Sequence, residues 1–333
     1  MQDSPQLSRR AFLKATGGLV FVGGTGAWFW SRNTDDELYA RRFLGLGTRL
    51  TLLVHHHDQR IARDAARRAM RRVFEVHALA TLFEPSPLGQ CNTRAFIEPV
   101  AAPTLLFQLL ERSSEMATRT QGLFDVTVGG LVSFFRSPRS AVSQDSLETV
   151  REGVGHTHLT LSPQTTTVRL THPRTAIDLN GIAKGFAVER AAEAIRETGV
   201  KDFLINAGGE IYAAGRAPDR MSGWRVRIEA QQPDAPPVLE VVLRDQAIAT
   251  SGNGRQPLTT EGGSHALHLF DPRRKLACDG LASASIVAAS PTEADAWSTA
   301  AFVAGSEAST DVLAHQQNLQ AYLVTKESRI ITL

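Results

Sequence analysis

Helical and strand-like periodicities are mixed along this chain without a regular strand–helix–strand alternation. Apolar residues recur at helical spacing over 61–82, 104–118, 186–197 and 293–303. Strand-like runs occupy 48–55, 158–161, 167–170, 203–206, 224–229, 239–243, 247–250, 266–270, 283–288, 319–324 and 330–333. Pro85 and Pro87 are expected to open a loop, and 124–130 to form another. This order favours an α+β fold in which helices pack on a largely antiparallel sheet.

Composition places the chain among ordinary globular proteins. Its 333 residues are 42% hydrophobic and 21% charged, which is enough for one large domain or two modest ones. The formal net charge of +2 gives no electrostatic case for binding nucleic acid. Arginines are concentrated between Arg60 and Arg72, where we interpret the charge run as the solvated face of a helix.

The N-terminus has the pattern of an export signal. Ser8-Arg9-Arg10-Ala11-Phe12-Leu13-Lys14 precedes an apolar, glycine-rich run from Ala15 to Trp30. Twin arginines before a moderately apolar stretch are typical of Tat signals, which predicts a periplasmic protein. The run is short for a spanning helix, which needs about 20 residues. We therefore expect residues 1–30 to be a Tat signal or a retained anchor, 31–42 a charged linker, and 43–333 the main domain.

Two cysteines, Cys91 and Cys278, are far apart in the sequence. An oxidising compartment permits a disulfide between them, but two separate buried thiols fit the spacing as well. The pairing stays open at this point.

The segment Asp178-Leu179-Asn180-Gly181-Ile182-Ala183-Lys184-Gly185 joins a carboxylate, two glycines and a lysine at the expected start of a helix. A glycine-rich turn that enters a helix offers backbone N–H groups to an anion, and a lysine adds a point charge suited to phosphate. A solvated lysine at a helix start is the plainer alternative for Lys184.

Asp295 and Thr299 are four residues apart on an expected helix, so their side chains share one face. A carboxylate and a hydroxyl together suit a hard cation such as Mg²⁺. The alternative is an acidic helix start followed by a threonine bonded back to its own chain.

Two further segments have chemistry of interest. His268 lies at the end of a strand pattern, before Asp271-Pro272, and a histidine there is suited to act as a general base. Asn206-Ala207-Gly208-Gly209 allows a ligand to approach the backbone closely, and a tight turn after a strand explains it equally well.

In order, these segments resemble the ApbE family of flavin transferases, which use FAD to attach FMN to threonine or serine of another protein. The motifs that carry the resemblance over about residues 43–333 are Leu46-Gly47-Thr48, Gly122–Gly129, Asp178–Ala187, Asn206–Ile211, Ala249–Asn253, His268–Arg273 and Ala294–Ala300. Leu46 stands where the family usually has methionine, a near-isosteric apolar replacement. The resemblance implies a T-fold-like core.

The resemblance also implies roles for individual residues. Mg²⁺ would be held by Asp295, Thr299 and the backbone carbonyl of Gly181, and His268 would help to deprotonate the acceptor hydroxyl. FAD would bind along a set of residues that comprises Leu46, Phe83, Leu123, Phe124, Asp125, Asp178, Lys184 and Leu269.

The partner implied is a flavoprotein with a periplasmic FMN domain. The Tat-exported, NosX-like branch makes a membrane-bound regulator of nitrous oxide respiration one candidate, so membrane contact is expected only through the signal, an anchor or the partner. Two other activities stay open for the same pocket. One is an FAD-binding carrier, and the other is a pyrophosphatase that converts FAD to FMN and AMP.

Overall fold

The structure, a computed structural model, describes residues 19–22, 27–30, 37–82, 85–136, 144–218, 222–228, 239–252, 258–259, 265–266, 269–278 and 280–333. Its centre is an eight-stranded sheet in the order β19-β18-β17-β12-β9-β8-β4-β3, in which every neighbouring pair is antiparallel. The strands are β3 (Leu38–Gly45), β4 (Thr48–His55), β8 (Asp202–Ala207), β9 (Glu210–Ala214), β12 (Gln246–Gly252), β17 (Ser283–Ala288), β18 (Gln320–Val324) and β19 (Ile330–Thr332). The predicted α+β class is confirmed.

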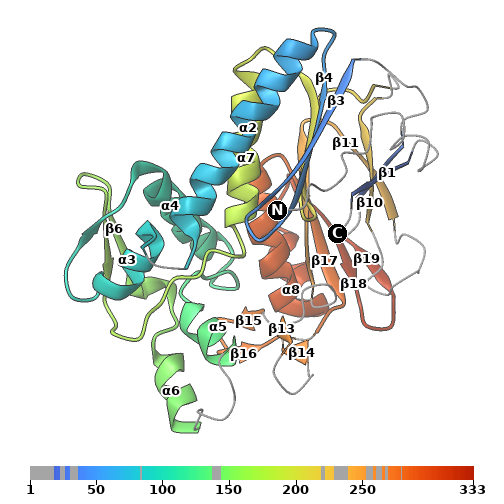
Figure 1. Cartoon of the computed structure of the whole chain (residues 1–333). Helices are drawn as coiled ribbons and strands as arrows, with labels where there is room; N and C mark the ends of the chain where they lie inside the picture. Colours follow the sequence, from blue (N-terminus) through green and yellow to red (C-terminus); the bar gives the residue numbers. More distant parts are fainter. Residues whose placement is uncertain are drawn as a thin grey trace.

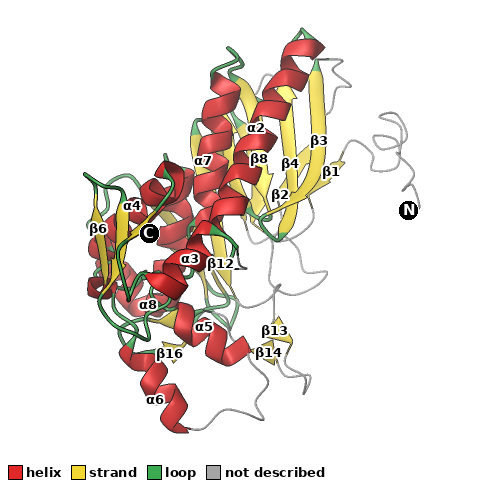
Figure 2. Cartoon of the chain, turned by 60° about the vertical axis from the view of Figure 1, so that its left-hand side comes forward, coloured by secondary structure: helices red, strands yellow, loops and turns green. Residues whose placement is uncertain are grey.

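The two faces of this sheet are covered differently. Helices α2 (Gln59–Ala80), α7 (Ala183–Arg196) and α8 (Pro291–Leu313) lie on one face, as Figures 1 and 2 show. The hairpin of β10 (Trp224–Ile228) and β11 (Leu239–Leu243) covers part of the other face. Side chains of β4 alternate accordingly: Leu50 and Leu52 join the core under α2, and Leu53 joins the core under the hairpin.

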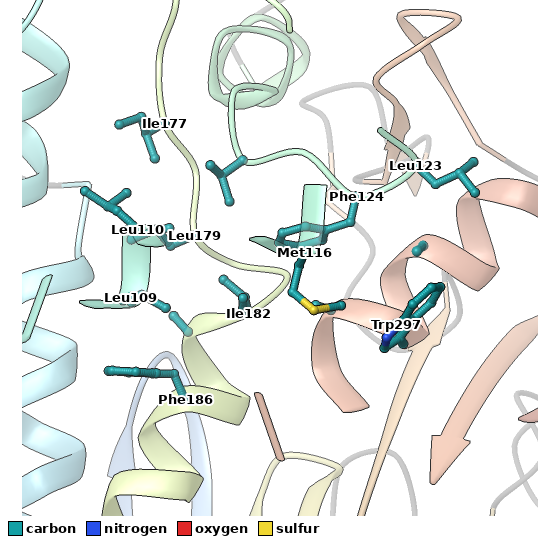
Figure 3. Close-up of a cluster of buried hydrophobic side chains, with 14 of the residues drawn as sticks. Leu109, Leu110, Met116, Leu123, Phe124, Ile177, Leu179, Ile182, Phe186 and Trp297 are labelled. Atoms are coloured by element: carbon teal, nitrogen blue, oxygen red, sulfur yellow. The ribbon is translucent and has the colours of Figure 1, made fainter. Parts of the chain in front are cut away.

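A second lobe packs beside the helices (Figure 1). It contains α3 (Pro87–Arg94), α4 (Thr104–Arg119), α5 (Gly129–Arg136), α6 (Gln144–Glu152), the 3₁₀ turn η2 (His156–His158) and a small sheet of β5 (Val100–Ala101), β6 (Leu159–Ser162) and β7 (Thr167–Leu170). Its core is continuous with α7 and α8, because Phe186 and Trp297 belong to the same buried cluster as Met116 (Figure 3). Short hairpins of β13 (Leu258–Thr259) with β14 (His265–Ala266), and of β15 (Phe270–Asp271) with β16 (Leu276–Ala277), complete the fold.

Several local expectations differ from the structure. The loop expected at Pro87 is helix α3, because proline is tolerated in a first helical turn and Ser86 caps it by accepting from Gly89 N at 2.9 Å. The loop expected over 124–130 ends where α5 begins at Gly129. Helix α8 extends beyond residue 303 and is kinked at Gly305, where φ is 75°. The strand expected over 266–270 is divided between β14 and β15.

The N-terminal region also differs in part. β3 begins at Leu38, inside the stretch expected to be a linker, because Leu38 pairs with His55 across the sheet edge. Within the expected signal, β1 (Leu19–Val22) and β2 (Ala27–Trp30) pair as antiparallel strands. Among the described residues, we find no helix with the length and apolar character needed to cross a membrane. Cys91 and Cys278 are both buried thiols, and burial raises the pKa of Cys91 to about 11.

Candidate active site

A cleft of about 450 Å³ opens between the second lobe and the end of the main sheet. Segments far apart in the sequence line it: 46–48 from the β3–β4 turn, 77–82 from the end of α2, 123–132, 178–184, 208–210, 250–252, 269–272 and 295–299. This volume is typical of a small-molecule site.

The turn that enters α7 is fixed at its start by hydrogen bonds of Ile177, Asp178 and Asn180. Asp178 N donates to Val126 O at 2.7 Å, and the Asp178 carboxylate accepts from Asn180 N at 2.8 Å and from Asn180 Nδ2 at 3.1 Å. The side chain of Asn92 also binds the backbone of Ile177 in both directions, at 2.7 and 2.9 Å. The buried Asp178 therefore shapes the turn as well as lining the cleft.

Helices α7 and α8 cross at Gly185, where only a glycine fits. A Cβ at Gly185 would lie 2.3 Å from Pro291 O and 2.7 Å from Asp295 Cβ. The close approach lets Gly185 N donate to Asp295 Oδ2 at 2.8 Å. Four residues earlier, a Cβ at Gly181 would lie 3.1 Å from Thr299 Oγ1. Gly181, Asp295 and Thr299, the three predicted cation ligands, thus converge in one corner of the cleft.

A buried ion cluster lies in the same corner. Lys184 Nζ pairs with Glu210 Oε1 and lies 3.8 Å from Asp295 Oδ1. Burial acts to lower the pKa of Lys184, but the charges of Asp295 and Glu210 outweigh it and raise that pKa. Burial raises the pKa of Asp295, and it raises the pKa of Glu210 to about 7, although Lys184 opposes both shifts. Asp295 and Glu210 therefore favour the positively charged form of Lys184.

Hydroxyl groups continue this polar corner toward β12. Ser251 Oγ lies 2.8 Å from Ser298 Oγ and 3.3 Å from Thr299 Oγ1, and Ser298 Oγ donates to Asp295 O at 2.9 Å. The Thr299 hydroxyl keeps lone pairs for a further contact, because a hydroxyl accepts as well as donates.

Part of the cleft wall is apolar. Leu46, Leu123, Phe124 and Leu269 line it, and Leu123 and Phe124 are almost fully buried (Figure 3). Asp125 interrupts this wall; its Oδ1 accepts from Thr127 N and from Thr127 Oγ1, both at 2.8 Å. Burial raises the pKa of the Asp125 carboxyl. The cleft thus places apolar side chains next to a charged corner.

The structure brings most of the predicted site residues into this one cleft. Those that line it are Leu46, Leu123, Phe124, Asp125, Asp178, Gly181, Lys184, Leu269, Asp295 and Thr299. His268 and Phe83 lie outside the described residues. Sequence reasoning missed Glu210, the partner of Lys184, and Ser251. The available signal for Glu210 was its position directly after Gly208-Gly209, the turn that follows a buried strand.

The fit of this corner to a cation rests on its oxygen donors. Among the residues that the structure describes, we find no cluster of three or more His, Cys, Asp or Glu side chains arranged as a metal site. One carboxylate, one hydroxyl and one carbonyl suit a hard ion that completes its coordination with water and phosphate oxygens. Asp295 Oδ1 and Thr299 Oγ1 are the atoms available for this purpose.

These features define a small-molecule enzyme site with an apolar wall and a phosphate-compatible polar corner. Residues 46–323 match the sequence profile of the ApbE family, so the chain belongs to that family and the resemblance found in its motifs is confirmed.

Relatives and solved structures agree with this assignment. The chain is 27% identical over 258 residues to the FAD:protein FMN transferase of Escherichia coli (strain K12), covering 75% of this chain and 73% of that protein. It is 30% identical over 314 residues to the FAD:protein FMN transferase of Rhodobacter capsulatus, covering 92% of this chain and 58% of that protein. The structure of the flavin transferase ApbE from Vibrio cholerae has a TM-score of 0.78 at 25% identity, covering 89% of this chain and 96% of that one.

The ApbE protein of Thermotoga maritima has a TM-score of 0.80 at 23% identity, covering 88% of this chain and 96% of that one. At that identity the likeness supports the fold alone.

Proposed function

We propose that this protein is an exported, Mg²⁺-dependent FAD:protein FMN transferase that modifies a threonine or serine hydroxyl and releases AMP. The observation that carries the proposal is the convergence of Gly181, Asp295 and Thr299 beside Lys184, in a cleft whose family relatives are named FAD:protein FMN transferases. Oxygen donors and a positively charged lysine next to an apolar wall suit a flavin joined to a diphosphate.

In this proposal, different residues of the cleft bind the flavin, the phosphate groups and the cation. Phe124, Leu123 and Leu46 provide the apolar wall for the flavin ring, and Lys184 holds a positive charge for phosphate. Asp295, Thr299 and the Gly181 carbonyl would hold the Mg²⁺ ion. When bound, that ion neutralises charge on the diphosphate as its bridging bond breaks.

The chemical step is a phosphoryl transfer. The acceptor hydroxyl oxygen forms a bond to the FMN phosphorus while the phosphoanhydride bond breaks, and AMP leaves. The hydroxyl proton passes to a base, a role that we assign to His268, because the next residue, Leu269, lines the cleft. We expect His268→Ala to retain FAD but to transfer FMN slowly. Unchanged single-turnover rates would remove His268 from this role.

One incubation separates the proposal from the two other activities of such a cleft. Protein lacking residues 1–36 is mixed with FAD, Mg²⁺ and a peptide that carries the family's acceptor pattern. A mass increase on the peptide equal to FMN minus water supports transfer. AMP release without peptide labelling indicates a pyrophosphatase, and neither product indicates a carrier.

Compartment and partner belong to the same proposal. The twin-arginine segment at Ser8–Lys14 supports Tat export to the periplasm, and the acceptor would be a membrane flavoprotein with a periplasmic FMN domain. A regulator of nitrous oxide respiration is one candidate. In-gel flavin fluorescence of membranes from a deletion strain tests this idea: loss of one fluorescent band supports it, and an unchanged pattern contradicts it.

A further inference from the structure

The outer surface of helix α2 has a large excess of positive charge. The interpretation of this surface as an ordinary solvated helix face does not explain that excess. The helix holds six arginines and only two acidic residues, Asp64 and Glu75, whereas the whole chain has a formal net charge of +2. Asp64 pairs with Arg67 and Arg68, and Glu75 pairs with Arg72. Arg63 and Arg71 are exposed and form no ion pair with any residue in the described part of the chain.

These arginines lie along one flank of the helix. Arg63, Arg67 and Arg71 follow each other at intervals of four residues, a spacing that aligns side chains along a helix. The buried side of α2 is formed by small apolar residues such as Ala62 and Ala69, so the row points away from the core.

The row of arginines leads toward the end of α2 that lines the cleft. One turn beyond Arg71, the ring of Phe74 is 43% exposed, and its Cε1 lies 3.7 Å from the Cβ position of Gly45, next to the β3–β4 turn. His77, in the last turn of the same helix, and Leu82, just after its end, line the cleft. We call Arg63, Arg67, Arg71 and Phe74 the α2 stripe.

We propose that the α2 stripe is the docking surface for the acceptor protein, and that it selects acceptors with acidic side chains to one side of the modified hydroxyl. The inference rests on the proposed transferase function. Its carrying observation is charge: a row of arginines with few carboxylate partners leads toward the end of α2 that lines the cleft. In the proposal, the acceptor hydroxyl enters the cleft beside this end of the helix. Opposite charges on two proteins raise the rate of encounter and fix its orientation.

Helix geometry sets the position of the acidic residues. At 1.5 Å per residue, Arg71 lies about 9 Å and Arg63 about 21 Å along the axis from His77 at the cleft. An extended acceptor segment covers about 3.3 Å per residue. The preferred acidic side chains should therefore stand about three to six residues from the modified threonine.

Two peptides test the proposal. Both carry the family's acceptor pattern around one threonine, and they differ only in a block beginning three residues beyond it, which is Glu-rich in one and Lys-rich in the other. For exposed charge pairs of ordinary strength, we expect kcat/KM for the Glu peptide to be about tenfold higher at low salt. The preference should shrink in about 0.5 M salt, where such pairs are screened.

Charge reversal provides the matched comparison. Arg63→Glu combined with Arg71→Glu should abolish or invert the preference and leave the FAD-induced rise in Tm unchanged. Lys201→Glu combined with Arg216→Glu is the control. These exposed residues flank β8 and β9 at the end opposite the Gly208-Gly209 turn, and the control should keep the wild-type preference. Unchanged far-UV circular dichroism establishes that both variants fold.

Each remaining outcome contradicts a specific statement. Equal labelling of both peptides by the wild type overturns the docking proposal and leaves the transferase proposal standing. A preference for the Glu peptide that persists in the Arg63→Glu, Arg71→Glu variant also overturns the docking proposal and leaves the transferase proposal standing. Labelling of neither peptide overturns both proposals. If the wild type binds phosphatidylglycerol vesicles, the double reversal releases it and the peptides are not distinguished, then the stripe faces a membrane and the docking proposal is wrong.

Discussion

The floor and the rim of the cleft are held by different forces. The floor, formed by Lys184, Gly185, Glu210 and Asp295, is buried and tied together between segments more than 20 residues apart in sequence. The rim, at the β3–β4 turn and the end of α2, is partly exposed and depends on local backbone geometry. Leu46 and Gly47 both adopt positive φ, 53° and 70°, in a two-residue hairpin turn.

This difference predicts where a substitution should lower activity and where it should change only the local backbone conformation. On the floor, one added methyl group meets backbone from another helix, whereas at Gly47 a Cβ would have no atom within 4 Å. The same floor carries the charges to which we assign the contacts with the cation and the diphosphate. Effects on the floor should therefore be larger, and they should involve activity as well as stability.

The largest effect is expected at Asp295. Asp295→Asn keeps an oxygen that can accept from Gly185 N but removes the negative charge that would hold a cation. We expect FMN transfer to fall by a factor on the order of 10³, equivalent to about 4 kcal/mol, with little change in Tm. Rates of AMP release and peptide labelling measure the loss. Wild-type turnover that persists in EDTA, or an active Asp295→Asn enzyme, would contradict the assignment.

Gly185→Ala should produce a large loss of stability, because its added methyl group has no room on the floor of the cleft. Its Cβ would meet Pro291 O at 2.3 Å, so α7 and α8 must separate, at a cost of about 3 kcal/mol. Urea denaturation measures this cost. Gly280→Ala is the control, because the nearest atom to its Cβ is 3.7 Å away. Equal denaturation midpoints for the two variants would show that the helix crossing is not tight.

Glu210 should give stability a pH dependence when no metal is bound. Burial raises its pKa in the folded protein from 4.5 to about 7. Between these values the folded protein binds a proton that the unfolded chain has lost, so unfolding free energy should fall as pH rises from about 4.5 to about 7. The contribution of Glu210 is at most about 3 kcal/mol. Glu210→Gln in EDTA should have a shallower slope, and parallel curves would contradict the argument.

Substitutions at the rim should change stability only slightly. Gly47→Ala adds no clash but places a Cβ on a residue with φ of 70°, which costs about 1 kcal/mol. Gly47→Asn should cost less, because asparagine tolerates this region better. Thermal denaturation of the two variants provides the measurement. If Gly47→Ala lowers stability as much as Gly185→Ala does, the proposed difference between rim and floor is wrong.

The sequence predicted the parts of the molecule whose signal is local or chemical. Alternating and helical periodicities located the main elements, and the spacing of Asp295 and Thr299 placed two oxygen donors on one helix face. Pro87 misled the prediction because a proline that ends one helix can equally start the next. β3 was missed at Leu38 because its register depends on pairing with β4, which charge composition does not show.

Contacts between distant segments could not be obtained from the sequence alone. Nothing local to Glu210 identifies Lys184 as its partner, because the turn at Gly208-Gly209 and the start of α7 meet only in the folded chain. The need for glycine at position 185 likewise comes from α8, more than 100 residues later. The arginines of α2 were visible in the sequence, but their approach to the cleft depends on how α2 lies beside the β3–β4 turn.

A crystal structure of the protein soaked with FAD and Mn²⁺, with anomalous scattering recorded for manganese, tests the central claim most directly. The account predicts an anomalous peak within coordination distance of Asp295 Oδ1, Thr299 Oγ1 and the Gly181 carbonyl, with diphosphate density against it. A peak elsewhere, or diphosphate bound away from this corner, would contradict it.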